Sequence, residues 1–203
     1  MSPIAKGEAW GSPGALPPDG VVVATDAEAR AVVEAARRAS RPLPALGLLG
    51  GDLCRTLGGA GDRARLHSDA AVTFTVDVGA VLVDGLLHWF VAHLVARTPG
   101  WGRAFVAMNA QWWGRWNLGP RAHPGDGVLD TYRADLSLAD RLKVRARLPA
   151  GAHLPHPGIR ERRVAALQVE FPRAVPVALD GQRSGRARSL SLRVEPDALT
   201  VVV

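Results

Sequence analysis

A glycine pair followed by an acid marks the segment 46–59, which has the sequence LGLLGGDLCRTLGG. An apolar run typical of a buried strand ends at Gly50 and Gly51, and Asp52 begins a stretch that predicts a short helix. A strand, a glycine turn and a helix start in this order match a phosphate-binding loop, because glycines let backbone N–H groups and a helix N-terminus approach an anion. The segment therefore predicts at least the outline of a phosphate loop.

Composition places the chain among folded, soluble proteins. It has 203 residues, of which 47% are hydrophobic, enough for a sizeable core. The formal net charge of +6 could indicate nucleic acid, but the basic residues are scattered arginines apart from Lys6 and Lys143, so we do not expect nucleic-acid binding. Cys54 is the single cysteine, which excludes internal disulfides and fits the cytoplasm. The most apolar segment, 81–96, is too short to span a bilayer.

The spacing of apolar residues predicts a β-α-β-α unit near the start of the chain. Strands are expected at 21–23 and 46–49, and helices at 26–40 and 52–57. Crossovers of this kind imply parallel strands. Residues 1–20 hold several prolines and glycines without periodicity, so we expect a flexible arm there.

From residue 72 the pattern changes to the alternation typical of antiparallel strands, with Asp84-Gly85 as a two-residue hairpin turn. A helix is expected at 137–147. Further strands are expected at 103–110, 128–136, 162–170, 175–179, 188–195 and 198–203. The predicted fold class is α+β, with a small α/β lobe (21–66) followed by a larger, antiparallel β-sandwich-like lobe (67–203).

This order of lobes resembles the diacylglycerol kinase-like lipid kinases, whose fold is shared with NAD kinases. LGLLGGDLCRTLGG is similar to the family segment G-T-G-N-D-L-A-R with its following T-L-G, and VVVATDAEA lies where the family has G-G-D-G-T. PRAHPGDGVLD resembles the approach to D-D-G-x-L-D. GAHLPHPGIRERRV, VALDGQ and VEPDALTV follow the family order of G-x-H, a basic strand, D-G-E and P-x-x-L-x-V. The resemblance covers residues 20–203.

The resemblance implies transfer of the γ-phosphoryl group of ATP to a lipid hydroxyl, assisted by Mg²⁺. Asp180 takes the position of the general base in D-G-E, and Asp126 that of the second acid of D-D-G, in a network that supports the metal. Both are therefore implied catalytic and metal-site residues. The implied nucleotide-binding residues are Thr25, Asp26, Gly50, Gly51, Asp52 and Arg55.

The chain departs from the family where residues touch phosphate. Residues 24–28 lack the glycines of G-G-D-G-T, and Glu28 would place a carboxylate where a threonine faces the phosphates. A like charge at about 4 Å costs on the order of 1–4 kcal/mol. Other polar family residues are replaced by Leu49, Gly51, Gly125 and Gln182. Family members usually carry further β-α units before the first loop, and at most twenty irregular residues precede it here.

Structural explanations compete with these roles. Asp26 could be a helix N-cap, while Asp126 and Asp180 could be the first residues of Asp-Gly turns. Three tryptophans in QWWGRW could line a lipid cleft or lie at a membrane interface, or simply pack in the core; they are Trp112, Trp113 and Trp116.

Two functions therefore remain open. The aspartates favour an ATP-dependent lipid kinase, whereas the lost glycines favour a non-catalytic relative that binds a lipid or a nucleotide. A third possibility is a homodimer formed through an exposed edge strand. Both cleft-based functions require Asp26, Asp126 and Asp180 to meet in one crevice between the lobes.

Overall fold

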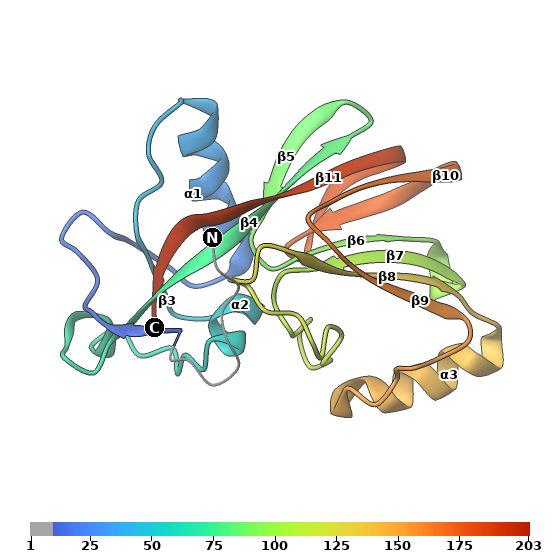
Figure 1. Cartoon of the computed structure of the whole chain (residues 1–203), viewed down its shortest axis with the longest axis horizontal. Helices are drawn as coiled ribbons and strands as arrows, with labels where there is room; N and C mark the ends of the chain where they lie inside the picture. Colours follow the sequence, from blue (N-terminus) through green and yellow to red (C-terminus); the bar gives the residue numbers. More distant parts are fainter. Residues whose placement is uncertain (1–9) are drawn as a thin grey trace.

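The computed structural model describes residues 10–203, and these form one mixed sheet with three α-helices against it (Figure 1). The strands are β1 (Ser12–Pro13), β2 (Val21–Val23), β3 (Leu46–Leu48), β4 (Val72–Val83), β5 (Leu86–Phe90), β6 (His93–Arg97), β7 (Arg103–Met108), β8 (Leu129–Asp135), β9 (Ile159–Val164), β10 (Ala166–Leu179) and β11 (Gln182–Val202). The helices are α1 (Asp26–Arg38), α2 (Gly51–Thr56) and α3 (Leu138–Arg147). The main strand order is β1-β4-β11-β10-β6-β7-β8-β9.

The α/β part has the predicted parallel arrangement. β2 pairs with β3, and β3 pairs in parallel with the end of β11, so the sheet runs without a break into the antiparallel part. The apolar face of α1, with Ala29 and Val33, packs in one core cluster with Leu53 of α2 and Val76 of β4. The two short helices therefore lie over the end of the long β4–β11 pair.

The antiparallel part folds over a second core, as the predicted sandwich-like fold requires. Side chains of β4, β5 and β11 meet those of β6, β7 and β8 around Phe90, Leu94 and Phe105. β11 is a single strand where the alternation predicted two, because its register with β4 shifts between Glu195 and Leu199. Such a bulge bends a strand without ending it.

Helix α3 covers the outer face of β6–β8. Val144 and Leu148 are buried with Val106 and Tyr132 in a third core cluster, against which Trp116 packs. Ser137 caps the helix by accepting a hydrogen bond from the Asp140 N–H at 3.1 Å. The loop with the tryptophans and α3 therefore share one layer.

The described part of the predicted arm, residues 10–20, is held against the sheet. β1 pairs with β4, and Leu16 is buried, with its N–H donating to Leu66 O at 2.7 Å. The remainder of the predicted arm, 1–9, lies outside the described residues. Among residues 10–203, every helix is too short or too polar to cross a bilayer.

Candidate functional site

Asp180 occupies a hairpin turn and also reaches into the interior. Leu179 pairs with Gln182 across the turn, and Asp180 and Gly181 have φ of 47° and 79°, the left-handed pair that a tight hairpin needs. The buried carboxylate accepts hydrogen bonds from the N–H groups of Val91, Ala92 and His93 at 3.0, 2.9 and 3.0 Å. Asp180 therefore fixes the junction between β5 and β6.

Thr25, not Asp26, caps helix α1. The Thr25 hydroxyl accepts from the Glu28 N–H at 3.2 Å, and the Glu28 carboxylate accepts from the Ala24 N–H at 2.8 Å. This reciprocal pair is a capping box, for which T-x-x-E at 25–28 is the sequence signal. The expectation that Glu28 faces a phosphate is wrong, because the cap holds its carboxylate.

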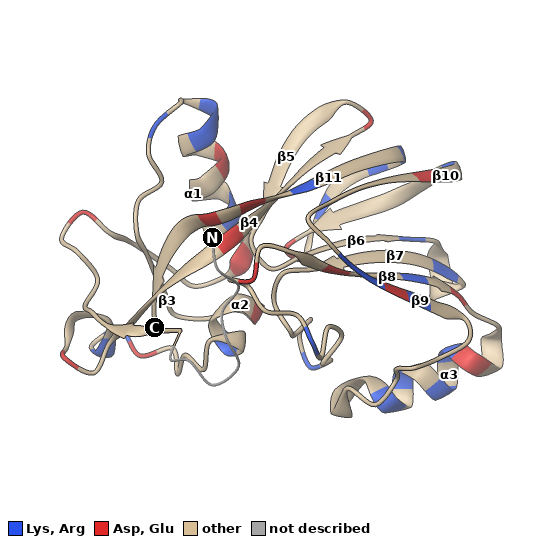
Figure 2. Cartoon of the chain, viewed as in Figure 1, with Lys and Arg blue, Asp and Glu red and all other residues tan. Residues whose placement is uncertain are grey.

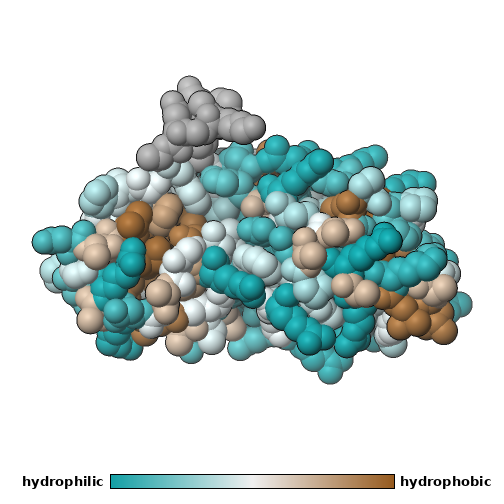
Figure 3. Space-filling model, turned by 90° about the horizontal axis from the view of Figure 1, so that it is seen from below, coloured by the Kyte–Doolittle hydropathy of each residue, from teal (hydrophilic) through white to brown (hydrophobic). Residues whose placement is uncertain are grey.

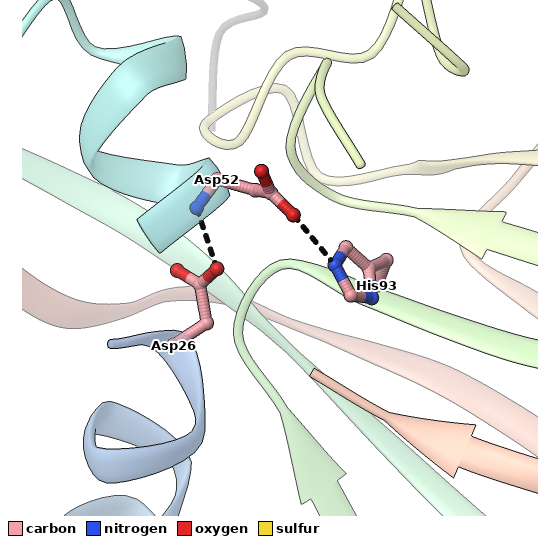
Figure 4. Close-up of side chains that lie close together, drawn as sticks. All are labelled: Asp26, Asp52 and His93. Carbon is pink, nitrogen blue, oxygen red and sulfur yellow. Dashed lines mark hydrogen bonds and ion pairs between the residues drawn. The ribbon is translucent and has the colours of Figure 1, made fainter. Parts of the chain in front are cut away.

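The carboxylate of Asp26 points across to α2 (Figure 4). It accepts from the N–H groups of Asp52 and Leu53 at 2.6 and 3.1 Å. Gly51 has φ of 94°, and a Cβ there would lie 2.9 Å from the Asp26 nitrogen; a Cβ at Gly50 would lie 2.6 Å from Ala24 O. The glycine pair thus lets two loops of the chain pack together, and Asp26 takes the helix-start amides expected to bind phosphate.

Asp52 carries the cluster on to β6. Its carboxylate pairs with His93 Nε2 at 2.9 Å and accepts from the Gly114 N–H at 2.8 and 3.0 Å. His93 begins β6 and is almost fully buried. Asp52 therefore joins α2, β6 and the tryptophan loop.

Burial and charge shift the acidities in opposite directions within this group. Burial raises the pKa of Asp26 to about 6, helped by the negative charge of Asp180. Burial raises the pKa of Asp180, while the charge of His93 and three N–H groups oppose it. Burial is the largest single influence on Asp52 and His93, but their mutual hydrogen bond and the neighbouring charges together exceed it, so the pKa of Asp52 falls and the pKa of His93 rises. Asp52 and His93 thus form a buried ion pair.

These side chains include a set that could hold a metal ion. One donor atom each from Asp26, Asp52 and His93 lies within 4.8 Å of the others. Carboxylate oxygens suit Mg²⁺, and each keeps a lone pair beyond its N–H bonds. The two carboxylates therefore suit a divalent cation, whereas His93 would be a ligand only after losing the proton that it shares with Asp52.

Asp126 is held in a separate group on the other side of Asn109. It forms an ion pair with Arg163, and its carboxylate accepts from the Val128 N–H at 3.2 Å, as a turn residue does. The Asp77 carboxylate accepts from the Gly127 N–H at 2.7 Å, next to Asp126. Asn109 donates both to Asp77 O and to Val91 O at 2.8 Å, which links this turn to the β5–β6 junction that Asp180 binds. The contacts thus join Asp26 and Asp180 through Asp52 and His93. Asp126, which was expected to meet them in one crevice, is not part of this cluster.

Two other residues singled out from the sequence make contacts within the chain. Arg55 stacks on Trp112, with its guanidinium carbon 3.5 Å from the ring centroid, and donates to Gly114 O at 2.9 Å. The Gln182 side-chain oxygen accepts from Arg30 at 2.8 Å, which ties the Asp180 turn to α1. Both side chains therefore support the arrangement of the loops.

Three tryptophans pack against one another, tilted or edge-on, and form a wall beside the cluster. Trp113 lies edge-on to His93 with centroids 6.3 Å apart, and it packs on Trp101 and Trp116 at 5.0 and 5.2 Å. Trp101 comes from the β6–β7 loop, which sequence analysis did not single out. The wall separates the carboxylate cluster from the space beneath α3.

That space is an apolar cavity of about 200 Å³ between α3 and β7–β8. It is lined by Trp116, Tyr132 and His153 among mostly aliphatic side chains. Within residues 10–203, the Tyr132 hydroxyl, His153 Nδ1 and Trp116 Nε1 are buried without a hydrogen-bond partner. Burial lowers the pKa of His153, opposed by a hydrogen bond with the Leu118 backbone, which favours the neutral ring. The cavity thus has mostly apolar walls, and three of its lining residues carry a polar atom that is buried without a partner.

Sequence analysis missed most of this cavity and, among the clustered side chains, His93. His93, Tyr132 and His153 are isolated in sequence, and Gly114 acts through its backbone N–H, which carries no side-chain signal. Two local signals pointed to the cavity: the QWWGRW stretch, whose Trp116 lines it, and the G-A-H stretch at 151–153, noted for its order along the chain.

Comparison with known proteins agrees with this architecture. The YegS C-terminal NAD kinase beta sandwich-like domain matches residues 70–203, and the chain belongs to this family. The family resemblance seen in the sequence is thereby confirmed. No curated protein matches the chain.

Three solved structures from Bacillus anthracis str. Sterne share the fold, the first two described as a putative diacylglycerol kinase and the third as a diacylglycerol kinase. The first has a TM-score of 0.67 at 15% identity and covers 90% of this chain and 77% of its own. The second has a TM-score of 0.65 at 14% identity, and it has the same coverage. The third has a TM-score of 0.56 at 15% identity, and the match covers 90% of this chain and 75% of the third structure's chain.

Proposed function

We propose that this protein is a lipid kinase-like, lipid-binding protein whose cavity beneath α3 holds part of a glycerolipid. The observation that carries the proposal is an apolar cavity of about 200 Å³, whose lining residues Tyr132, His153 and Trp116 each carry a buried polar atom without a partner. A buried polar group without a partner costs about 1–3 kcal/mol, so a ligand hydroxyl or carbonyl recovers part of that energy. An apolar cavity of roughly 150 Å³ holds benzene, so this one suits a short length of alkyl chain. The similarity to proteins described as diacylglycerol kinases supports diacylglycerol as the lipid class.

Binding of dioctanoylglycerol tests this proposal. We expect the ligand to raise the melting temperature, and Tyr132→Phe to weaken binding by about fivefold or more because one ligand hydrogen bond is lost. Thr75→Val, which removes an exposed hydroxyl outside the cavity, is the matched control. Equal affinity in wild type and Tyr132→Phe, or no binding by wild type, would contradict the proposal.

Phosphoryl transfer is the second candidate, and Asp180 favours it. A buried carboxylate with a raised pKa suits acceptance of a proton from a lipid hydroxyl. Mg²⁺, held by Asp26 and Asp52, would neutralise phosphate charge. The α2 amides expected to bind the phosphates of ATP are already bonded to Asp26, so nucleotide binding there requires these bonds to open.

Transfer of labelled phosphate from ATP to diacylglycerol in detergent micelles tests this second candidate. If the protein is a kinase, wild type and Asp69→Asn, an exposed control, both incorporate label. Asp180→Asn should then lose nearly all incorporation. A wild type that incorporates no label leaves lipid binding as the function.

Homodimer formation stays a prediction. Among the described residues β2 pairs with β3 alone, so its outer edge is open to a second copy. Light scattering of the purified protein measures the oligomeric state.

A further inference from the structure

Helix α3 has an apolar face on each side. Its inner face buries Val144 next to the cavity, while Leu138 and Leu142 are 66% and 64% exposed. These two belong to the few large apolar side chains exposed within residues 10–203. A helix that only covered a core would carry polar residues outside, so the outer face needs another explanation.

The outer apolar residues form one stripe. At about 100° per residue, the side opposite Val144 carries four apolar positions, all exposed. They are Leu138, Ala139, Leu142 and Ala146. The stripe runs the length of the helix.

Basic residues border the stripe on both sides. Arg141 and Arg145 lie along one border, Lys143 and Arg147 along the other, and Asp140 is the one acid of the helix. Arg145 also lies over the Trp116 ring at 5.7 Å. Figure 2 shows this blue-bordered helix at the edge of the molecule, and Figure 3 shows apolar residues gathered at that end among hydrophilic ones. An apolar stripe between cations is the pattern of a helix lying in a membrane interface.

We propose that the outer face of α3 docks the protein onto an anionic lipid bilayer. Leu138 and Leu142 enter the interfacial region, and Lys143, Arg145 and Arg147 contact lipid phosphates. Because Leu138, Leu142 and Arg145 also line the cavity, the cavity then opens toward the bilayer. This inference extends the proposed function by naming the surface from which the lipid comes, and it requires no phosphoryl transfer.

The β4–β5 hairpin is the rival surface. Leu82, Leu86 and Leu87 are 40%, 71% and 36% exposed there, but the tip carries Asp84. Asp84 is exposed to solvent. Hydrogen bonds from the Ser189 and Arg188 N–H groups lower its pKa, so the carboxylate stays negative. Arg188 lies beside this carboxylate, and the hairpin lies away from α3 (Figure 1), so Leu86 offers a matched control.

Co-sedimentation with vesicles tests the docking. Wild-type protein should bind phosphatidylcholine vesicles containing phosphatidylglycerol and bind pure phosphatidylcholine at least about tenfold more weakly, with binding falling as salt rises. Leu138→Ser with Leu142→Ser should weaken binding to the anionic vesicles by about tenfold or more, and Lys143→Glu with Arg147→Glu by a similar factor. Leu86→Ser should bind as wild type.

The proposal is overturned if the leucine double variant, shown by circular dichroism to be folded, binds as wild type, or if Leu86→Ser loses binding instead. Equal binding to neutral vesicles overturns it as well. Dioctanoylglycerol binding, measured without vesicles, separates the two proposals: if it persists while vesicle binding fails, the docking alone is refuted.

Discussion

Replacing Asp26 by asparagine should remove a distinct pH dependence of stability. Burial and the charge of Asp180 raise the pKa of Asp26 to about 6 in the folded protein, from an ordinary 3.8. The folded state therefore binds more protons than the unfolded state between these values, and stability falls as pH rises through them. Below pH 3.8 the stabilising contribution is fully present, and above about 6 it is lost.

The size of the change in the free energy of unfolding follows from the shift in the pKa of Asp26. A raise from 3.8 to about 6 corresponds to about 3 kcal/mol in total at 1.36 kcal/mol per pH unit. About 2 kcal/mol of this falls between pH 4.5 and 7.5, where the protein is convenient to handle. Asparagine does not titrate, so the Asp26→Asn variant should gain about 2 kcal/mol relative to wild type over that interval.

Urea unfolding at pH 4.5, 6.0 and 7.5 measures the effect as the difference between the two free energies of unfolding at each pH. Asp180 acts on the pKa of Asp26, and the charge of Asp26 acts on the pKa of His93, so the difference reports the titration of these interacting groups. Asp69→Asn is the control, because Asp69 is exposed and should leave the pH slope unchanged. A parallel pH profile for Asp26→Asn and wild type would refute the assigned burial of charge.

Three further substitutions test the loops and the cavity. Gly51→Ala should lower the free energy of unfolding by about 1–3 kcal/mol, because φ at this position is 94° and the new Cβ meets Asp26. An unchanged melting temperature in calorimetry would contradict the close approach of the two loops. Thr25→Ala should lower the free energy of unfolding, measured in urea, by about 1 kcal/mol, because the N-cap of α1 is lost. An unchanged free energy would mean that the Glu28 carboxylate caps the helix without the Thr25 hydroxyl. Tyr132→Phe should keep or raise the free energy of unfolding while weakening lipid binding, because it removes a buried hydroxyl without a partner; a loss of stability would show that the hydroxyl is already satisfied.

Local signals predicted most of the fold. Helical spacing from Asp26 and the Asp-Gly pairs at 84–85 and 180–181 depend on a few neighbouring residues, and the structure has α1 and both hairpins there. The continuity of β11 was missed because Pro196 interrupts the alternation, whereas the backbone passes it with a register shift. A bulge and a strand end look alike in sequence, since both break the period of two.

The site was less predictable, because spacing gives order along the chain and not the face on which a side chain lies. Asp26 and Asp180 approach one cluster through their turns, but Asp126 pairs with Arg163, a residue 37 positions away whose partner no local pattern selects. His93 was visible only as a polar residue in an apolar segment. Its pairing with Asp52 depends on how α2 packs against β6, which only the assembled sheet determines.

The energetics of the loops set a limit on nucleotide binding. Two charge-assisted hydrogen bonds join Asp26 to the start of α2, and each contributes about 1.5–3 kcal/mol. Opening both costs about 3–6 kcal/mol, whereas a nucleotide that binds with a dissociation constant of about 1 mM gains only about 4 kcal/mol. ATP would therefore need further contacts, such as a cation between its phosphates and the Asp26 and Asp52 carboxylates, to displace the chain's own carboxylate. A lipid entering the cavity faces no such competitor, because the cavity is open space and its lining residues Tyr132, His153 and Trp116 hold polar atoms that have no partner among the described residues.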